Sequence, residues 1–504
     1  MSSVVSRYAF SSTAVLTLSV ATCLLSGCVV GPAYVKPTID APPAYRFAQD
    51  SQEAPSDVDT TGWWRDFGDP ELDALVTEGM RSNHDLRIAT LRVDEFAARV
   101  IAARSAGLPQ IGYGSSLSRQ TLSGTNLGES YSALLSASWE IDLWGRIRRE
   151  DEAARANLLA TDAARIGVGL TVTAAIVSGY ITLLDLDRRL QIAESTVEGR
   201  RRNVEVFQMR LDGGVVSDFE MMQVTAEYET AVAAVPDLKR AIDLQENALS
   251  LLLGRNPGPI KRGVTLENLS VPKVPAGIPS DLIERRPDIL QSEQQLVAAN
   301  AMVGVARALY FPRLSLTGSA GGVSSELDDL FSGPARSWSF VGQLLGPIFS
   351  GGAIDSANRQ ADARRDQAVV SYGKTVQDAF RDVEDALASL NANRLLVASY
   401  QRRVQSLERA VGLSQERYDN GYADYLEVLD TERSLFSARL TLTAVQGDSL
   451  RNLTDLYRAL GGDWTQEAAP VPPPPQSSIS KTGASMLPPL ARRAWVVART
   501  NGIA

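Results

Sequence analysis

The chain has 504 residues, 44% of them apolar, and a formal net charge of −9. This length supplies enough apolar material for several domains or for one elongated fold. The acidic balance argues against a nucleic-acid-binding protein, which normally presents a basic surface. Two cysteines and one histidine in the whole chain leave little for thiol, zinc or histidine chemistry. We therefore expect no metal, no cofactor and no enzyme activity.

The N-terminus has the features of an export signal. Arg7 precedes an apolar run over residues 14–25, which is too short to span a bilayer comfortably. Both cysteines, Cys23 and Cys28, lie in this region, and the run ends in Leu-Ser-Gly-Cys28, which resembles the lipobox of bacterial lipoproteins. That resemblance implies that residues 1–27 are removed and that Cys28 is acylated. Because Val29 rather than Asp follows, it also implies the outer membrane.

The two ends of the mature chain show no periodicity. Residues 28–69 are rich in Pro, Ser, Asp and Ala, which predicts an extended N-terminal strap. Residues 466–504 contain a run of prolines followed by Ser, Lys and Arg, which predicts a disordered tail.

Between these ends the sequence repeats itself once at a constant offset of 207 residues. An equal spacing over more than 100 residues indicates internal duplication. We divide the chain into a first repeat, residues 70–265, and a second repeat, residues 266–465. The matched positions are Gly145, Ile147, Ala154, Ala156, Arg210, Asp212, Gly214, Glu220, Leu253 and Gly254, which recur as Gly352, Ile354, Ala361, Ala363, Arg417, Asp419, Gly421, Glu427, Leu460 and Gly461.

Each repeat contains a predicted pair of strands. Residues 131–141 alternate apolar and polar side chains with period two, which is typical of a strand with two unlike faces. We predict a partner strand over residues 111–122, and strands at 314–320 and 338–344 in the second repeat. Gly and Ser at 123–126 and 321–324 predict the intervening loops.

The remainder of each repeat is predicted to be helical. Residues 145–212 contain no proline and predict one helix of about 100 Å at 1.5 Å per residue. Apolar residues recur in it at exact sevens, which favours left-handed coiling of packed helices. These residues are Ile176, Leu183, Leu190, Val197, Val204 and Leu211, with Val383, Leu390, Val397, Val404, Val411 and Tyr418 in the second repeat.

Turns end both long helices. Asp212-Gly213-Gly214 and Asp419-Asn420-Gly421 supply residues that tolerate the left-handed conformation of a helix end. Return helices are expected to reach about residues 253 and 460. A further helix is predicted before each strand pair, over 70–106 and 279–309, with Pro109 and Pro312 at the change from helix to strand.

Four strands with one polar and one apolar face cannot lie alone in a bilayer, because open edges leave backbone groups unpaired in hydrocarbon. Closure requires other copies of the chain. Two copies would make a barrel of eight strands and three copies a barrel of twelve, and the residues alone permit either number.

Several motifs resemble one known family. They are Cys28-Val29-Val30-Gly31-Pro32-Ala33-Tyr34, Trp63-Trp64-Arg65-Asp66-Phe67-Gly68-Asp69-Pro70-Glu71-Leu72, Arg417-Tyr418-Asp419-Asn420-Gly421 and Leu456-Tyr457-Arg458-Ala459-Leu460-Gly461-Gly462. Over residues 23–465 the chain is similar to the TolC-like outer-membrane factors, and most similar to the lipoprotein branch that serves resistance-nodulation-division pumps. The resemblance implies a homotrimer with a membrane β-barrel of twelve strands continued by a coiled α-helical tunnel in the periplasm.

The same resemblance implies the function and the partners. We expect a passive, gated outer-membrane duct of a tripartite efflux pump, which docks on a periplasmic membrane-fusion adaptor and an inner-membrane transporter. The chain has no phosphate-binding Walker motif, so the energy must come from that transporter. The alternatives are a structural coiled-coil envelope protein or an adaptor without channel activity, and a hydrolase. The first does not account for the repeated strand pairs, and no catalytic arrangement supports the second.

Two groups of tip residues are candidate functional sites. Three copies of Asp419 around one axis would concentrate negative charge at the tunnel mouth, where bridges to arginine would tighten the closed tip. The candidate gate residues are Asp419, Arg417, Glu416, Asp212 and Arg210. The candidate adaptor-docking residues are Leu211, Gly213, Gly214, Val215, Tyr418, Asn420, Gly421 and Tyr422. Turn capping is the structural alternative for both aspartates, and an ordinary helical hairpin is the alternative for the docking turns.

Overall fold

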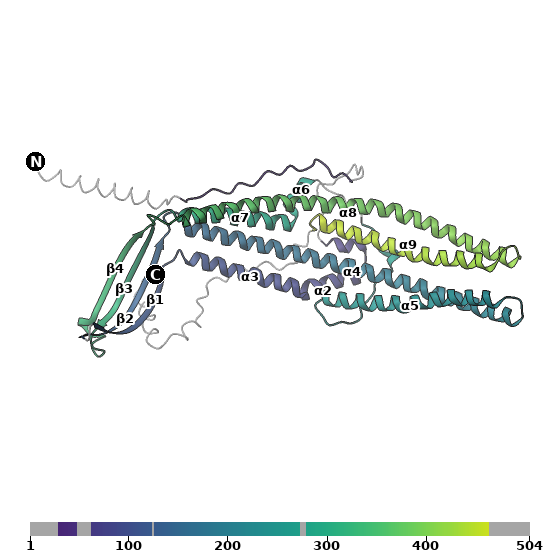
Figure 1. Ribbon diagram of the computed structural model, residues 1–504, viewed down its shortest axis with the longest axis horizontal. Helices are drawn as coiled ribbons and strands as arrows, with labels where there is room; N and C mark the ends of the chain where they lie inside the picture. The colour runs from purple at the N-terminus through teal and green to yellow at the C-terminus, as the bar shows by residue number, and fades with distance from the viewer. Residues whose placement is uncertain (1–28, 48–61, 123–124, 273–278, 463–504) are drawn as a thin grey trace, which may run out of the picture. The chain divides into compact units, whose positions relative to one another are not determined.

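The computed structural model describes residues 29–47, 62–122, 125–272 and 279–462 (Figure 1). These residues belong to one compact unit, which combines a four-stranded sheet with long helices. The predicted signal peptide, Cys28 and the proline-rich tail lie outside the described residues.

The strands form one antiparallel sheet in the order β1-β2-β3-β4. They are β1 (Gln110–Leu122), β2 (Thr125–Ile141), β3 (Arg313–Ser324) and β4 (Arg336–Leu345). The two strand pairs meet where Trp139 of β2 pairs with Leu316 of β3. A cross-strand hydrogen bond of 2.8 Å joins the hydroxyls of Ser116 and Ser132. β1 and β4 therefore form the two free edges of the sheet.

The predicted loop at residues 321–324 is wrong, because β3 continues through this segment to Ser324. Gly321 pairs with Leu134 and Gly322 with Ala133. A Cβ at Gly321 would lie 2.0 Å from the carbonyl oxygen of Ala133, so glycine permits the close approach of the two strands. Residues 125 and 126, also predicted as loop, belong to β2.

Two long helical hairpins follow the strand pairs. The first consists of α4 (Arg146–Asp212) and α5 (Asp218–Leu252), and the second of α8 (Ala353–Asp419) and α9 (Tyr425–Ala459). α4 and α8 each have 67 residues, and α5 and α9 each have 35. The predicted long helices are confirmed. Because α4 begins five residues after β2, its distal turn lies about 100 Å from the sheet (Figure 1).

The helix predicted before each strand pair is in fact two helices. α2 (Pro70–Ser82) and α3 (His84–Ser105) are separated at Asn83, and α6 (Pro279–Arg285) and α7 (Pro287–Ala308) at Arg286. The Asn83 side chain accepts a hydrogen bond from the Leu86 N–H, 2.9 Å away, and so caps α3. Arg286 precedes a proline, which disfavours helical geometry at that residue.

The largest core lies where both repeats meet. Ile176 and Leu183 from the predicted heptad series are fully buried, as is Val383 of the second repeat. The end of the predicted strap joins this core, because the side chains of Trp63, Trp64 and Phe67 are buried in it. Trp63–Phe67 forms a short 3₁₀ helix, η1, and not the extended chain that was predicted. α4 is long and apolar enough to cross a membrane by length and composition, but 56% of its apolar window is buried inside the fold, which is typical of a core helix.

Residues 29–47 are extended, as predicted, and are held at several points along the helices. The Val30 N–H donates to the carbonyl oxygen of Trp144 at 3.0 Å, beside the start of α4. Lys36 forms an ion pair of 2.9 Å with Glu293 of α7. Further along, the backbone N–H groups of Arg46 and Phe47 donate to the carboxylate of Glu384 in α8. This segment therefore runs from the sheet–helix junction across α7 to α8.

Candidate functional site

Both distal turns are closed by backbone hydrogen bonds around a left-handed glycine. In the first turn, the Val215 N–H donates to the carbonyl oxygen of Arg210 at 2.8 Å, and Gly214 has a φ of +69°. In the second, the Tyr422 N–H donates to Arg417 at 2.8 Å, and Gly421 has a φ of +75°. A Cβ at either glycine would meet no atom within 4 Å. Within one chain, the space beside both turn glycines is therefore free for a partner to approach.

An apolar cluster behind the turns joins the two hairpins. This tip cluster contains three aromatic rings, of which Phe207 lies 4.2 Å from Tyr425 and Tyr418 lies 5.0 Å from Tyr425 between ring centroids. Its buried members are Phe207, Met221, Val224, Tyr425, Val428 and Leu429, with Val204, Leu211, Val216 and Tyr418 partly buried against them. Burial raises the pKa of the Tyr425 hydroxyl, so this ring stays neutral.

One polar contact at the tip links the hairpins directly. Arg210 of α4 donates to the hydroxyl of Tyr418 of α8 at 2.8 Å. The same guanidinium lies 5.4 Å from the ring centroid of Tyr418 and 5.7 Å from that of Phe207, within cation–π range. Arg210 and Tyr418 thus form a latch between the first and the second hairpin.

The other candidate gate residues lie on the exposed side of the tip. Asp212 accepts a hydrogen bond from Gln208 at 2.9 Å, and Asp419 accepts one from Gln415 at 3.1 Å. Arg417 pairs with Glu427 of its own hairpin at 3.4 Å. Within one chain the two arginines thus contact Tyr418 and Glu427 rather than the neighbouring aspartates. Glu416 is exposed, and its carbonyl oxygen accepts two hydrogen bonds from Asn420.

The candidate docking residues divide into two groups. Leu211 and Tyr418 point into the tip cluster, whereas Gly213, Gly214, Asn420 and Gly421 are exposed. Val215 and Tyr422 are 75% and 79% exposed. Sequence reasoning missed further exposed apolar side chains beside them, namely Met209, Phe219, Met222 and Leu426. Large apolar residues close to a glycine turn could have indicated these positions in the sequence. Together these side chains make the exposed surface of the two tips apolar.

A buried charged group lies deeper between the hairpins and was also missed. Arg200 of α4 pairs with Glu227 of α5 at 3.1 Å, and Glu432 of α9 accepts a hydrogen bond from Asn203 at 3.5 Å. Burial raises the pKa of Glu432, and the charge of Arg200 acts in the opposite direction. These partners are far apart in sequence, so no local pattern reveals them.

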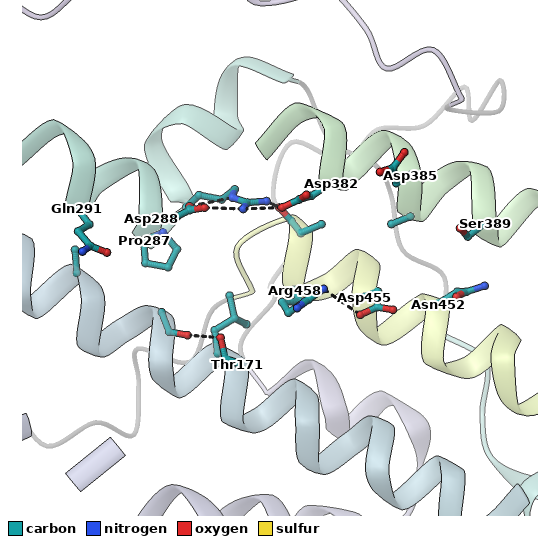
Figure 2. Close-up of a pocket in the computed structure, with 16 residues that line it drawn as sticks. Thr171, Pro287, Asp288, Gln291, Asp382, Asp385, Ser389, Asn452, Asp455 and Arg458 are labelled. Carbon is teal, nitrogen blue, oxygen red and sulfur yellow. Dashed lines mark hydrogen bonds and ion pairs between the residues drawn. The ribbon is translucent and has the colours of Figure 1, made fainter. Parts of the chain in front are cut away.

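A polar pocket of about 530 Å³ opens where four helices meet (Figure 2). Arg286 stands at its edge: it donates to the Ala459 carbonyl oxygen at the end of α9 (2.9 Å), to Asp382 of α8 (3.1 Å) and to Asp288 (2.6 Å). Burial opposes ionisation of Asp382, but hydrogen bonds from Arg381 and Arg286 outweigh it and lower the pKa. Arg286 therefore ties α7, α8 and α9 together.

The pocket does not resemble an active site. Its other polar lining residues are Thr171, Gln291, Asp385, Ser389, Asn452, Asp455 and Arg458, of which Arg458 pairs with Asp455 at 3.3 Å. Among the described residues, no group of three or more His, Cys, Asp or Glu side chains is placed to hold a metal.

Comparison with known proteins identifies the family. Residues 75–255 and 278–462 match the model of the outer membrane efflux protein family. The chain is 33% identical to the cation efflux system protein CusC of Escherichia coli (strain K12) over 442 residues, covering 87% of this chain and 97% of CusC. It is also 33% identical to the probable efflux pump outer membrane protein TtgC of Pseudomonas putida, over 90% of this chain and 96% of TtgC.

The fold gives the same result. The structure of the Neisseria gonorrhoeae MtrE outer membrane channel in its open state superimposes with a TM-score of 0.80 at 31% identity, covering 87% of this chain and 99% of MtrE. The chain belongs to the outer membrane efflux protein family. It is an outer-membrane efflux duct and not an enzyme, which confirms the predicted family and function and excludes the structural and hydrolase alternatives.

Proposed function

We propose that three copies of this chain close a barrel of twelve strands in the outer membrane, continued into the periplasm by a tunnel of coiled helices. The observation that supports this most strongly is the open sheet. All ten residues of β4 are exposed, as are residues 110–119 of β1. Two unpaired edges in hydrocarbon are too costly to persist, so β4 of one copy pairs with β1 of the next. The two repeats, residues 70–265 and 266–465, then alternate around the ring.

The distal tips dock on a periplasmic membrane-fusion adaptor, which connects the duct to an inner-membrane resistance-nodulation-division transporter. The exposed apolar side chains at the tips support this assignment, because Val215, Phe219 and Tyr422 together form a surface suited to a protein partner. The transporter supplies the energy and the duct is passive.

The tips also form the gate. The latch between Arg210 and Tyr418 holds the second hairpin against the first, and Asp212, Asp419, Glu416 and Arg417 place charge at the mouth. Docking on the adaptor releases the latch and lets the second hairpin move outward. The electrostatic character of the open mouth then comes from the aspartates.

Acyl chains on Cys28 hold the protein to the membrane in addition to the barrel. Val30 is bound to Trp144 at the sheet–helix junction. Cys28 precedes Val30 by only two residues in the sequence. The acyl chains and the barrel therefore enter the membrane at the same level.

Small toxic compounds are the proposed cargo. The relatives are described as components of cation, antibiotic, toluene and solvent efflux systems. The tunnel is a shared exit for such varied cargo, and we assign selectivity to the inner-membrane partner.

The function is tested by measuring the accumulation of fluorescent and antibiotic compounds in a deletion strain. We expect accumulation to rise for at least some compounds and to fall again when the gene is supplied on a plasmid. Unchanged accumulation of every compound would contradict an export role.

Gly214→Trp and Gly421→Trp, introduced together, test the docking role of the turns. We expect export to be lost while the protein still reaches the outer membrane as a trimer, because the new side chains project into the open space that the partner fills. Gly214→Ala with Gly421→Ala is the matched control: it carries the same backbone cost of about 1–2 kcal/mol per left-handed residue without the bulk. Equal export by both double variants would contradict docking at these turns.

A further inference from the structure

Charged side chains meet inside the packed interface between the two hairpins, about 18 Å from the end of α4. Arg200 of α4 is 5% exposed and pairs with Glu227 of α5 at 3.1 Å. Its guanidinium also lies 5.5 Å from the ring centroid of Phe436 of α9. Glu432 of α9 accepts a hydrogen bond from Asn203 of α4 at 3.5 Å. We call Arg200, Asn203, Glu227 and Glu432 the buried polar cluster; it lies between the first and the second hairpin.

The buried polar cluster is not a shared feature of the two repeats. α5 and α9 begin and end at the same offset of 207 residues, so their positions can be compared directly. At that offset the four members of the cluster correspond to Leu407, Ala410, Ser434 and Thr225. None of these four residues is charged. The same hairpin is therefore built without such charges in the other copy, which indicates a role for the cluster beyond folding.

The cluster contains two carboxylates and only one guanidinium. Arg200 pairs directly with Glu227, so Glu432 has no arginine of its own within the cluster. Arg433 approaches Glu227 at 4.0 Å, but it is 62% exposed and pairs with Asp430 on its own helix. The ionised form of Glu432 is therefore only partly compensated while the hairpins are packed together.

Neutral groups also surround Glu432. Asn203 of α4 contributes an amide, and the hydroxyl of Tyr425 of α9 stays protonated because the ring is buried in the tip cluster. α8 contacts the adjoining position of α9 through the hydroxyls of Ser414 and Thr431, which lie 2.9 Å apart. These groups add no positive charge beside the Glu432 carboxyl.

The packed and the separated hairpins therefore differ in their affinity for a proton. Burial raises the pKa of Glu432, the charge of Arg200 and the hydrogen bond from Asn203 oppose the rise, and the charge of Glu227 adds to it. When the second hairpin moves away from α4, Glu432 meets water, where a glutamate has a pKa of about 4.3. The packed hairpins thus bind this proton more tightly than the separated ones.

We propose that Glu432 is a pH switch for the opening of the tip: protonated Glu432 holds the second hairpin on α4, and ionised Glu432 favours its movement outward. Because the packed state has the higher pKa, this stabilisation of the closed tip is complete in acid and is lost as the pH rises through the packed-state pKa. The inference rests on the proposed gate and adds its regulation by pH.

Conductance of the purified full-length trimer in a planar lipid bilayer, recorded from about pH 4 to about pH 8, tests the switch, because this range begins near the ordinary pKa of a glutamate. We expect wild-type conductance to be lowest in acid and to rise towards neutral pH. Glu432→Gln replaces the carboxyl by a neutral amide, so its conductance should stay at the acidic level of the wild type and lose the pH dependence. Glu432→Met, which also cannot ionise, should behave in the same way if the amide disturbs the packing.

Asp430→Asn is the matched control. It removes a carboxylate from the same helix at a position that is 61% exposed, and it should keep the wild-type pH profile. Asp212 and Asp419 at the mouth are unchanged in both variants, so the difference between the two profiles isolates Glu432. A Glu432→Gln profile that follows the wild type, or a wild-type conductance that does not change with pH, would overturn the switch.

Arg210→Met, recorded at neutral pH, serves as the open reference and separates the switch from the proposed function. Strong conductance by Arg210→Met beside identical pH profiles of the wild type and Glu432→Gln would leave the duct and its gate intact and remove the switch. If none of the inserted proteins conducts, the proposed function fails and the switch fails with it.

Discussion

Arg210→Met is expected to open the tip of the duct and make the outer membrane permeable to large antibiotics. The change removes the hydrogen bond to Tyr418 and the charge that lies over two aromatic rings, but it retains an apolar side chain in the tip cluster. A hydrogen bond to a charged group contributes about 1.5–3 kcal/mol. Its loss shifts the balance between closed and open tips about tenfold to a hundredfold in each chain, at 1.4 kcal/mol per factor of ten.

The measurement is the minimum inhibitory concentration of an antibiotic that the intact outer membrane excludes, in cells with equal amounts of each variant. Arg417→Met is the matched control, because Arg417 pairs with Glu427 inside one hairpin and does not link the two. Tyr418→Phe should give a smaller effect than Arg210→Met, since it keeps the ring. If Arg210→Met is no more permeable than Arg417→Met, the latch does not hold the tip closed.

Arg286→Met should destabilise the protein without touching either tip. Arg286 is 8% exposed, and its guanidinium donates hydrogen bonds to Asp288, to Asp382 and to the Ala459 carbonyl oxygen at the end of α9. Met leaves the buried Ala459 carbonyl oxygen without its donor, which costs about 1–3 kcal/mol, whereas the carboxylates of Asp288 and Asp382 are 43% and 37% exposed and can be solvated. We expect a lower midpoint of thermal unfolding in detergent and less protein in the outer membrane.

Arg458→Met provides the comparison for this prediction. Arg458 lines the same pocket, but it makes an exposed ion pair of 3.3 Å with Asp455 one turn away. Such pairs contribute about 0–1 kcal/mol, so the midpoint should hardly change. Equal midpoints for Arg286→Met and Arg458→Met would mean that Arg286 does not hold the three helices together.

The features with a clear period were predictable from the sequence. The alternation at residues 131–141 led to the strand because it depends only on local side-chain direction. The exact offset of 207 residues led to the second copy of the long hairpin because it compares the sequence only with itself. The helix breaks were also readable: Asn83 is a good N-cap residue, and Arg286 precedes a proline. The glycines at 321 and 322 misled the prediction because they serve close strand pairing, not a turn.

The polar contacts of the tip were not predictable in the same way. Arg210 and Tyr418 stand at almost matched positions of the two repeats, and only the packing of one hairpin on the other brings them together. The same holds for Arg200, Glu227 and Glu432, which come from three different helices. A single sequence shows which residues lie at the tip, whereas the choice of partners depends on tertiary structure.

Conductance of the purified full-length protein in a planar lipid bilayer measures the duct and its closure together. We predict that the wild-type protein inserts and conducts only weakly, and that Arg210→Met gives a large, steady conductance with the same number of inserted trimers. A cation preference that falls in the Asp419→Asn variant would support the charged mouth. If inserted wild-type and Arg210→Met proteins conduct equally, or neither conducts at all, the chain is not a duct closed at these tips.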